Sequence, residues 1–303
     1  RRYQDGFYGI CEALLESHIP FDVFDESWLP ALIKRDGLKC LVLPSAGALK
    51  DETIEAIRRF VDDGGALVVT GGVDSRTAEL LGLHYEGTRE FEEGEWNRSK
   101  QHSYISVDLP DDPLFDEFHQ QEVIAYKGPF ELLEWRSDEG GETLGRQIAP
   151  LPSQPPEKGW LRPPTDRGAI FRAQSRRGTL FAFDLPRLFH AFRLPEHRKL
   201  VASAVLQYAA PPFKFEGPES VEVVTGYIGG DAALFLINHA GSLLNHEKLA
   251  VGPIELTVPG RVQSLRLLWG PEAALAASDS GSTISVARLE DAAWIVLGGY
   301  FWP

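Results

Sequence analysis

The chain has 303 residues, of which 43% are hydrophobic and 24% charged, so it can bury ordinary cores, and its length predicts two domains. Its formal net charge of -14 disfavours contact with a phosphate backbone, so we expect no nucleic-acid partner. No stretch approaches the roughly 18 apolar residues of a membrane-spanning helix, and we expect no membrane partner. The 2 cysteines, Cys11 and Cys40, form no disulfide framework and are interpreted as buried free thiols. The cytoplasm is favoured as the location.

Helix and strand patterns alternate in the first part of the chain. Helical spacing of apolar residues covers 8–17 and 28–33, begins again at Asp51 and ends at Gly64-Gly65, and returns at 77–81. Short apolar strands are predicted at 21–25, 40–43 and 66–69. This rhythm is typical of an open parallel sheet, which usually begins with a strand. The chain opens on a helix and contains 0 Met, so we expect Arg1 to be an internal position and the first strand to lie upstream.

The middle of the chain is irregular. An insertion of about residues 85–166 is rich in charge, Gly and Pro, and we predict short strands and long loops there, the strands at 104–107, 123–126 and 132–135. Regularity returns with a hairpin-like pair, residues 169–171 and 179–183, around Arg176-Arg177-Gly178. His190 and His197 are expected to line a loop. An apolar helix at 200–208 then ends at Pro211-Pro212, where we place the end of a first domain, residues 1–212.

The remaining residues, 213–303, contain no helical rhythm. Six short strands separated by Gly, Pro and Ser turns are predicted at 221–226, 232–238, 254–258, 262–268, 283–286 and 293–297. Short strands with regular turns indicate a small antiparallel β-sandwich. The predicted fold is therefore an α/β domain with a mostly parallel sheet and helices on both faces, followed by an antiparallel β domain.

The expected strand ends offer no complete catalytic site. An open parallel sheet places a site at the carboxyl ends of its strands, here residues 44–47 and 70–74. A nucleophile elbow needs a Ser or Cys between glycines, but Ser45 follows Pro44, and Thr70 has no base to activate it. Glycines at 140, 141 and 145 lack the strand and helix of a dinucleotide fingerprint. The 8 His residues show no metal-binding spacing. We predict no catalytic residue, cofactor or metal.

One acidic loop is a candidate for contact with sugar. Glu93 and Glu95 lie beside Trp96, and Trp160 lies in the Pro-rich stretch 153–166. Paired carboxylates near an aromatic ring are used in glycoside cleavage, but neighbours in sequence need not face each other across a cleft. A solvated acidic loop is the competing interpretation. If the loop touches sugar, we expect it to form a lip beside another domain's active site.

Several stretches resemble a known family. They are GFYGICEALLESHIPFDVF, KCLVLPSAGALKDETIEAIRRFVDDGGALVVTGG, LLGLHYEG and RRGTLFAFDLP, followed by VEVVTGYIGGDAALFLINHAG and PIELTVPGRVQSLRLLWGPE. Together they resemble the glutamine-amidotransferase-like trimerisation domain and the small C-terminal β domain of family 42 type β-galactosidases. The resemblance implies a class I amidotransferase or flavodoxin-like fold that has lost its nucleophile. It also implies a catalytic (β/α)8 barrel N-terminal to this chain, and a homotrimer.

Three functions are considered from the sequence. The first is a non-catalytic structural and oligomerisation region of a glycoside hydrolase, whose partners are the catalytic barrel of the same protein and further copies of the chain. The second is a stand-alone carbohydrate-binding or regulatory protein with an amidotransferase-like fold. Loop or terminal tryptophans, Trp96, Trp135, Trp160 and Trp302, could then stack on sugar, although such rings also anchor loops. The third is a hydrolase that uses loop carboxylates such as Glu93 and Glu95.

Overall fold

The computed structural model describes residues 2–33, 37–45, 47–89, 103–116, 118, 123–149, 161–242 and 247–303. Contacts divide the chain into two compact units. The α/β unit contains Arg1–Ala13 and Val23–Ala209, and the β unit contains Leu14–Asp22 and Ala210–Pro303. Within the described residues, no helix is both long and apolar enough to cross a membrane.

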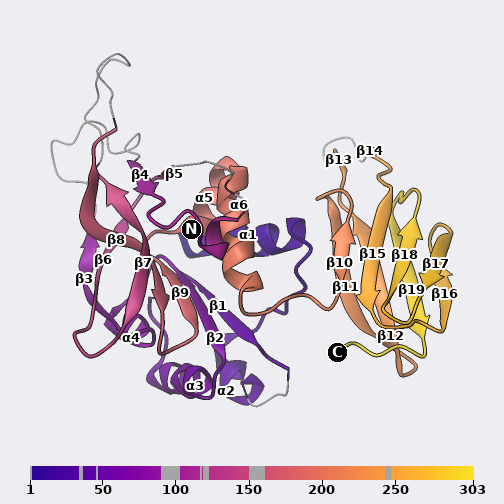
Figure 1. Ribbon diagram of the computed structural model, residues 1–303, viewed down its shortest axis with the longest axis horizontal. Coiled ribbons are helices and arrows are strands. Elements are labelled where there is room, and N and C mark those ends of the chain that lie inside the picture. Colours follow the sequence, from indigo (N-terminus) through magenta and orange to yellow (C-terminus); the bar gives the residue numbers. More distant parts are fainter. Residues whose placement is uncertain are drawn as a thin grey trace. The chain divides into compact units, whose positions relative to one another are not determined.

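The α/β unit is built on a seven-stranded mixed sheet with the strand order β1-β2-β9-β8-β7-β4-β5 (Figure 1). The bounds are Cys40–Pro44 (β1), Ala66–Thr70 (β2), Ser103–Ser106 (β4), Val123–Tyr126 (β5), Gly141–Ile148 (β7), Pro164–Ala173 (β8) and Gly178–Phe181 (β9). A separate antiparallel pair consists of β3 (Leu83–Arg89) and β6 (Phe130–Trp135). Every residue of β2 is buried, as expected for a strand covered on both faces.

The sheet corrects the expectation of a mostly parallel arrangement. β1, β2 and β9 run parallel to one another, whereas the four pairings from β9 through β8, β7 and β4 to β5 are antiparallel. The physical reason is the connection between strands, because a tight turn can join only antiparallel neighbours. The predicted hairpin is confirmed by the pairing of Ala173 with Gly178. Strands of the irregular middle stretch then extend the same sheet.

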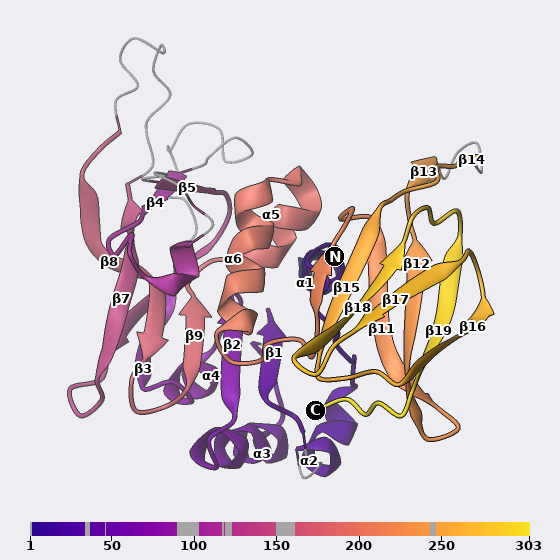
Figure 2. The same cartoon turned by 45° about the vertical axis from the view of Figure 1, so that its right-hand side comes forward.

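The five predicted helices occur close to their expected positions with shifted ends, and α5 is additional. Their bounds are Arg2–Glu16 (α1), Leu29–Leu32 (α2), Asp51–Asp62 (α3), Ser75–Glu79 (α4), Leu185–Phe192 (α5) and Pro195–Leu206 (α6), with short 3-10 turns at Glu26–Trp28 (η1) and Pro113–Phe115 (η2). Figures 1 and 2 show α2 beside α3 and α5 beside α6. In α1 the buried positions Gly6, Gly9, Ile10 and Ala13 recur at helical spacing, so one narrow face of small residues packs inward.

The predicted strand at 21–25 is wrong. These residues form no regular element, and Val23 and Phe24 are 56% and 41% exposed. A short apolar run becomes a strand only where a neighbouring strand offers its edge, and none of the described sheets includes this segment.

The predicted loop around His190 and His197 is also wrong, because both residues lie in helices. Asp184 accepts a hydrogen bond from the backbone N–H of Arg187 and so caps α5, which ends at Arg193 in a left-handed conformation (φ 54°). The next helix begins with proline, which suits the first turn. These capping signals mark α5 and the start of α6, neither of which the hydrophobic periodicity indicates, although the predicted helix at 200–208 covers most of α6.

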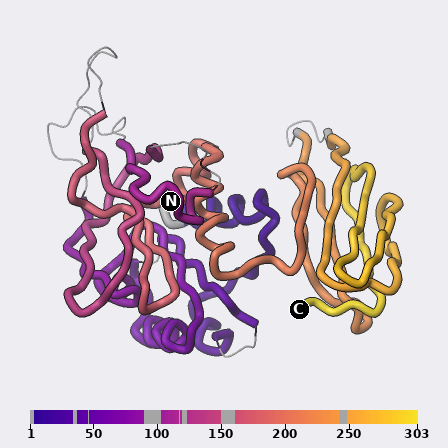
Figure 3. The backbone as a smooth tube through the Cα atoms, in the orientation of Figure 1, coloured from indigo at the N-terminus to yellow at the C-terminus, as the bar shows by residue number. Residues whose placement is uncertain are grey.

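The β unit is an antiparallel sandwich of two four-stranded sheets, which Figure 3 traces from the orange to the yellow end of the chain. One sheet has the order β10-β15-β18-β17 and the other β11-β12-β19-β16. The bounds are Lys214–Glu216 (β10), Val221–Ile228 (β11), Asp231–Asn238 (β12), Ile254–Pro259 (β15), Ser264–Trp269 (β16), Ala273–Ala277 (β17), Gly281–Val286 (β18) and Ala292–Gly298 (β19). A small pair, β13 (Gly241–Ser242) and β14 (Glu247–Lys248), lies outside both sheets.

One apolar core joins the two sheets of the β unit. Alternate residues of each strand point into it, for example Leu234 and Leu236 of β12 and Leu256 of β15. The six predicted strands are all present, and β10 and β17 are additional. The segment Leu14–Asp22 belongs to this unit as well, and His18 binds the carbonyl oxygen of Val221 through Nδ1 at 2.9 Å.

Candidate functional site

The carboxyl ends of β1, β2 and β9 meet at one edge of the sheet, where the topology places any site of an open α/β fold. Ser45 follows β1 in a left-handed conformation (φ 49°), and its N–H donates to the carbonyl oxygen of Thr70 at 2.9 Å. Gly71 and Gly72 follow β2, also with positive φ. A Cβ atom on Gly71 would lie 2.7 Å from the Cα atom of Asp184, so glycine is required for this close approach.

Asp184 is the first of two buried carboxylates at this edge. It follows β9 and caps α5, and its side chain is 13% exposed. One carboxylate oxygen, Oδ2, accepts the hydroxyl of Ser45 at 3.0 Å and lies 3.3 Å from Nε of Arg187. Burial raises the pKa of Asp184, and the charge of Arg187 and the hydrogen bond from Ser45 oppose that rise.

Glu131 is the second carboxylate and lies in β6. It is only 3% exposed, and both of its oxygens accept hydrogen bonds. The N–H of Gly72 donates to Oε1 at 3.0 Å, and the hydroxyl of Thr88 donates to Oε2 at 2.6 Å. Burial raises the pKa of Glu131, the charge of Asp184 raises it further, and the two hydrogen bonds lower it. Glu131 therefore holds the Gly71-Gly72 turn, while Asp184 holds the neighbouring Ser45.

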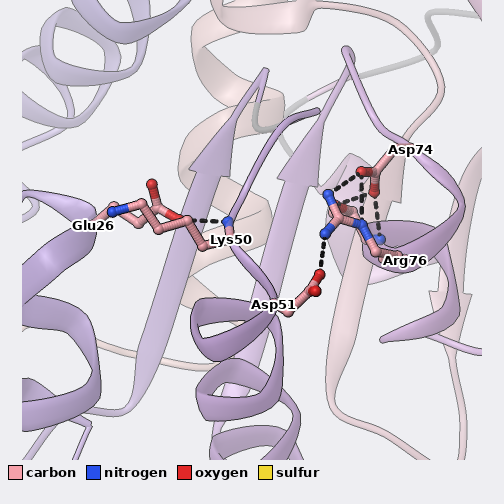
Figure 4. A network of polar contacts seen from close by, with 6 residues as sticks. Glu26, Lys50, Asp51, Asp74 and Arg76 are labelled. Atoms are coloured by element: carbon pink, nitrogen blue, oxygen red, sulfur yellow. Dashed lines mark hydrogen bonds and ion pairs between the residues drawn. The ribbon is translucent and has the colours of Figure 1, made fainter.

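The helix N-termini near the first two strands are also occupied by protein carboxylates (Figure 4). Oε1 of Glu26 accepts the N–H of Lys50 at 2.6 Å, at the start of α3. Asp74 caps α4, and Nη2 of Arg76 lies 2.9 Å from its Oδ2. Nη1 of Arg76 reaches Oδ1 of Asp51 at 2.6 Å. Helix N-termini are natural anion sites, but here the chain's own acidic side chains already take these places.

Ser45 and the two carboxylates lie where a catalytic site would be expected, but their contacts differ from those of a nucleophilic or glycoside-cleaving site. A serine nucleophile needs an imidazole or amine base, but the hydroxyl of Ser45 donates to a carboxylate. Helix α1 also lies close above this hydroxyl, because a Cβ atom added to Gly6 would be 3.2 Å from Oγ of Ser45. Paired carboxylates that cleave glycosides need room for sugar and water, whereas both oxygens of Glu131 bind protein donors. Among the described residues, no three or more His, Cys, Asp or Glu side chains gather to hold a metal ion.

Two histidines of the α/β unit make contacts within the protein, and both cysteines are free. His190 binds Oε2 of Glu12 through Nδ1 at 3.0 Å, and His197 is 1% exposed with Nε2 at 2.6 Å from the carbonyl oxygen of Ala125. Burial lowers the pKa of His197, which keeps the imidazole neutral. Cys11 and Cys40 are free thiols, and burial raises the pKa of Cys40 to about 12, so its reactive thiolate is scarce at neutral pH.

Glu93, Glu95, Trp96 and Trp160, the residues predicted to form a sugar-contacting loop, lie outside the described residues. Two other tryptophans considered for stacking pack within the protein. Trp135 lies in β6 and meets the ring of Phe171 edge-on, while Nε1 of Trp302 donates to the carbonyl oxygen of Gly226 at 3.0 Å. These two rings anchor the fold.

Sequence reasoning missed both Asp184 and Glu131. Asp184 carries a recognisable signal, because an Asp two residues before a proline is typical of a helix N-cap. Glu131 carries none, since an acidic residue in an apolar strand is normally placed on the exposed face.

A groove of about 340 Å³ lies elsewhere in the α/β unit. It is lined by residues of α4, β3, β6 and the turn after β6, namely Glu79, Leu83, His84, Glu134, Trp135, Arg136, Ser137 and Asp138. The lining does not include Ser45, Glu131 or Asp184, so this groove is not the edge formed by the carboxyl ends of β1, β2 and β9.

The raised pKa of Glu131 predicts a pH-dependent stability. The folded chain binds this proton more tightly than the unfolded chain, whose carboxyl has the ordinary value of 4.5. Between the ordinary and the raised pKa, the free energy of unfolding therefore falls as pH rises. Glu131→Gln keeps the shape but cannot ionise. We expect its stability relative to the wild type to increase between about pH 4 and about pH 7 in urea titrations.

Glu134→Gln is the matched control, because Glu134 lies on the same strand with an exposed side chain. Its stability difference from the wild type is the baseline against which the pH dependence of Glu131→Gln is measured. If the difference in the free energy of unfolding between Glu131→Gln and the wild type changes no more with pH than it does for the control, ionisation of Glu131 does not affect the stability of the fold.

Comparisons with known proteins identify the fold. No protein-family model and no curated protein matches the chain. Among solved structures, α-L-fucosidase isoenzyme 2 from Paenibacillus thiaminolyticus is similar over 97% of this chain and 45% of its own, with a TM-score of 0.70 and 16% identity. β-Galactosidase from Bacillus circulans sp. alkalophilus is similar over 98% of this chain and 38% of its own, with a TM-score of 0.59 and 13% identity.

A cold-adapted β-galactosidase from Rahnella sp. R3 is similar over 95% of this chain and 37% of its own, with a TM-score of 0.57 and 14% identity. The chain thus spans less than half the length of these three glycoside hydrolases and shares the fold of that part. At such identities the likeness concerns the fold alone.

Proposed function

We propose that this chain is a non-catalytic structural and oligomerisation region of a glycoside hydrolase, of the type seen in family 42 β-galactosidases. The observation that carries the proposal is the occupied carboxyl edge of β1, β2 and β9. There the hydroxyl of Ser45 is committed to Asp184, and Glu131 holds the Gly71-Gly72 turn. An edge that would hold a nucleophile in an amidotransferase-like fold instead fastens loops together. The fold shared with parts of several glycoside hydrolases supports the same function.

In this proposal, catalysis belongs to a (β/α)8 barrel of the same protein, and the α/β unit contributes to a homotrimer. An amidotransferase-like ancestry explains why three parallel strands end at one edge without a reactive side chain. The proposed location is the cytoplasm, where free thiols such as Cys11 and Cys40 persist.

The proposal predicts that the 303-residue chain does not hydrolyse glycosides. We expect no release of nitrophenol from nitrophenyl β-galactoside or α-fucoside above a buffer blank. Asp184→Asn and Glu131→Gln are assayed in parallel, because they alter the two buried carboxylates. Turnover by the wild type that disappears in either variant would overturn the proposal and reveal a working site. Turnover that all three share at one rate would identify a contaminating hydrolase. Sedimentation velocity on the same sample tests self-association, for which the expected mass is that of a trimer.

A further inference from the structure

A row of apolar side chains crosses the outer face of the β11-β12-β19-β16 sheet. Strand register places Val224 opposite Phe235, Phe235 opposite Trp294, and Trp294 opposite Trp269. Their chain neighbours Leu234 and Ile295 point into the core, so the row points away from it. Trp269 is 50% exposed and Trp294 is 46% exposed. We call these four residues the aromatic row.

The rings of the aromatic row touch but do not share a plane. The ring centroids of Phe235 and Trp294 are 5.8 Å apart with an interplanar angle of 70°. Those of Trp294 and Trp269 are 6.2 Å apart at 55°. A flat crystalline surface cannot lie against both indoles, whereas a flexible chain that twists between them can.

The aromatic row is too narrow for a stable protein interface. Two residues further along the strands, the same face carries Gly226, Ala233 and Val296, and the last two are almost completely buried. Half-exposed aromatic rings offer roughly 100 Å² each, so the row presents a few hundred Å². A specific protein–protein interface buries about 800 Å² on each partner. A second copy of the chain or another protein is therefore a poor match to this strip.

Hydrogen-bonding side chains flank the aromatic row on both sides. Arg266 is exposed on β16, opposite Val296, and Leu265 and Leu267 on either side of it pack against the core. On the other side, Glu222 of β11 pairs with His239, with Oε2 and Nε2 2.7 Å apart. A donor and an acceptor thus border the aromatic row, with the partly exposed Ile237 opposite Glu222 in the neighbouring row.

We propose that the aromatic row binds a soluble glycan chain, with pyranose rings stacked on Trp269 and Trp294. A pyranose presents C–H groups on its face, which the electron-rich face of an indole attracts, and hydroxyl groups at its rim, which Arg266 and Glu222 can bind. The choice of glycan as the ligand rests on the proposed function, and the site itself rests on the geometry. The β unit would then hold substrate polymer close to the catalytic part of the parent enzyme.

Affinity electrophoresis of the full chain tests the site. Native gels contain soluble galactan, galactomannan or fucosylated xyloglucan. We expect at least one polysaccharide to retard the wild type, and Trp294→Ala and Trp269→Ala each to weaken that binding on the order of tenfold. Trp28→Ala is the matched control, since Trp28 is 66% exposed but lies in the α/β unit. Trp294→Phe retains an aromatic ring and should keep part of the affinity, which separates stacking from a folding defect.

Three results would overturn the proposal. The first is that none of the three soluble polysaccharides retards the wild type. The second is that both Trp→Ala variants of the aromatic row bind as tightly as the wild type. The third is that Trp28→Ala loses as much affinity as those variants. Binding to microcrystalline cellulose as strong as to the soluble chains would contradict the twisted geometry. The result is independent of the hydrolysis assay: an inert chain that binds no glycan refutes only the aromatic row, and a chain that cleaves glycosides refutes only the proposed function.

Discussion

Gly9→Ala is expected to destabilise the α/β unit by about 3 kcal/mol or more. Gly9 lies on the buried face of α1, and a Cβ atom there would be 1.9 Å from the carbonyl oxygen of Pro186 in α5. The clash is with backbone, so no side-chain rotation relieves it, and α1 must move away from α5. Urea-induced loss of the far-ultraviolet circular dichroism of the full chain measures the free energy of unfolding.

Gly6→Ala is the matched control in the same helix. A Cβ atom at Gly6 would lie 3.2 Å from the hydroxyl of Ser45 and 3.3 Å from Oδ1 of Asp184, both ends of side chains that need to shift by only a few tenths of an ångström. Alanine also favours a helix over glycine by about 1 kcal/mol. We expect this variant to stay within about 1 kcal/mol of the wild type. Equal losses at Gly6 and Gly9 would show that α1 does not pack against α5 as described.

Asp184→Ala is expected to cost about 3 kcal/mol. The carboxylate caps α5, accepts the hydroxyl of Ser45 and balances the charge of Arg187, whose side chain is only 21% exposed. Its removal leaves the largely buried cation of Arg187 and the partly buried hydroxyl of Ser45 without that partner. Asp184→Asn keeps the size and one acceptor oxygen, so a smaller loss is expected. The same urea titration measures both variants.

Asp25→Ala provides the comparison for a cap without burial. Asp25 accepts the N–H of Ser27 at 2.9 Å, but this cap is exposed. We expect a smaller loss of stability than for Asp184→Ala, because the cap is fully exposed to water. If Asp184→Ala costs no more than Asp25→Ala, the contacts of Asp184 with Ser45 and Arg187 contribute nothing to stability.

These predictions share one physical idea. In many open α/β folds the carboxyl edge of the sheet is left open for a ligand, and its donors and acceptors await a substrate. Here α1 lies over Ser45, and the polar groups at the edge bind one another. These contacts join the end of β1 to the start of α5 beneath α1.

Local pattern was sufficient for much of the fold. The apolar runs of β1 and β2 and the helix at Asp51 are recognisable because each shows apolar residues with the spacing of its own secondary structure, although β2 is fully buried and β1 only partly. The six predicted strands of the β unit follow from short apolar runs between turn residues. At 21–25 the same apolar pattern predicted a strand that is absent, because none of the described strands pairs with this segment.

The candidate sites depended on distant parts of the chain. Ser45 and Asp184 are 139 residues apart, and Gly72 and Glu131 are 59 apart, so no spacing rule links them. Trp269 and Trp294 meet only because β16 pairs with β19, a register that a bulge between Leu267 and Trp269 adjusts.

The sequence by itself determined the kinds of elements, the alternation of helix with strand, and the absence of a glycine-flanked nucleophile, because these are properties of neighbouring residues. Only the tertiary structure decided that most strands of the sheet pair antiparallel, that Glu131 is buried and Asp184 largely buried beside the Gly71-Gly72 turn, and that two indoles share one exposed face. Pairing and burial are set by which distant segments compete for the same edge or core, and that competition has no local signature.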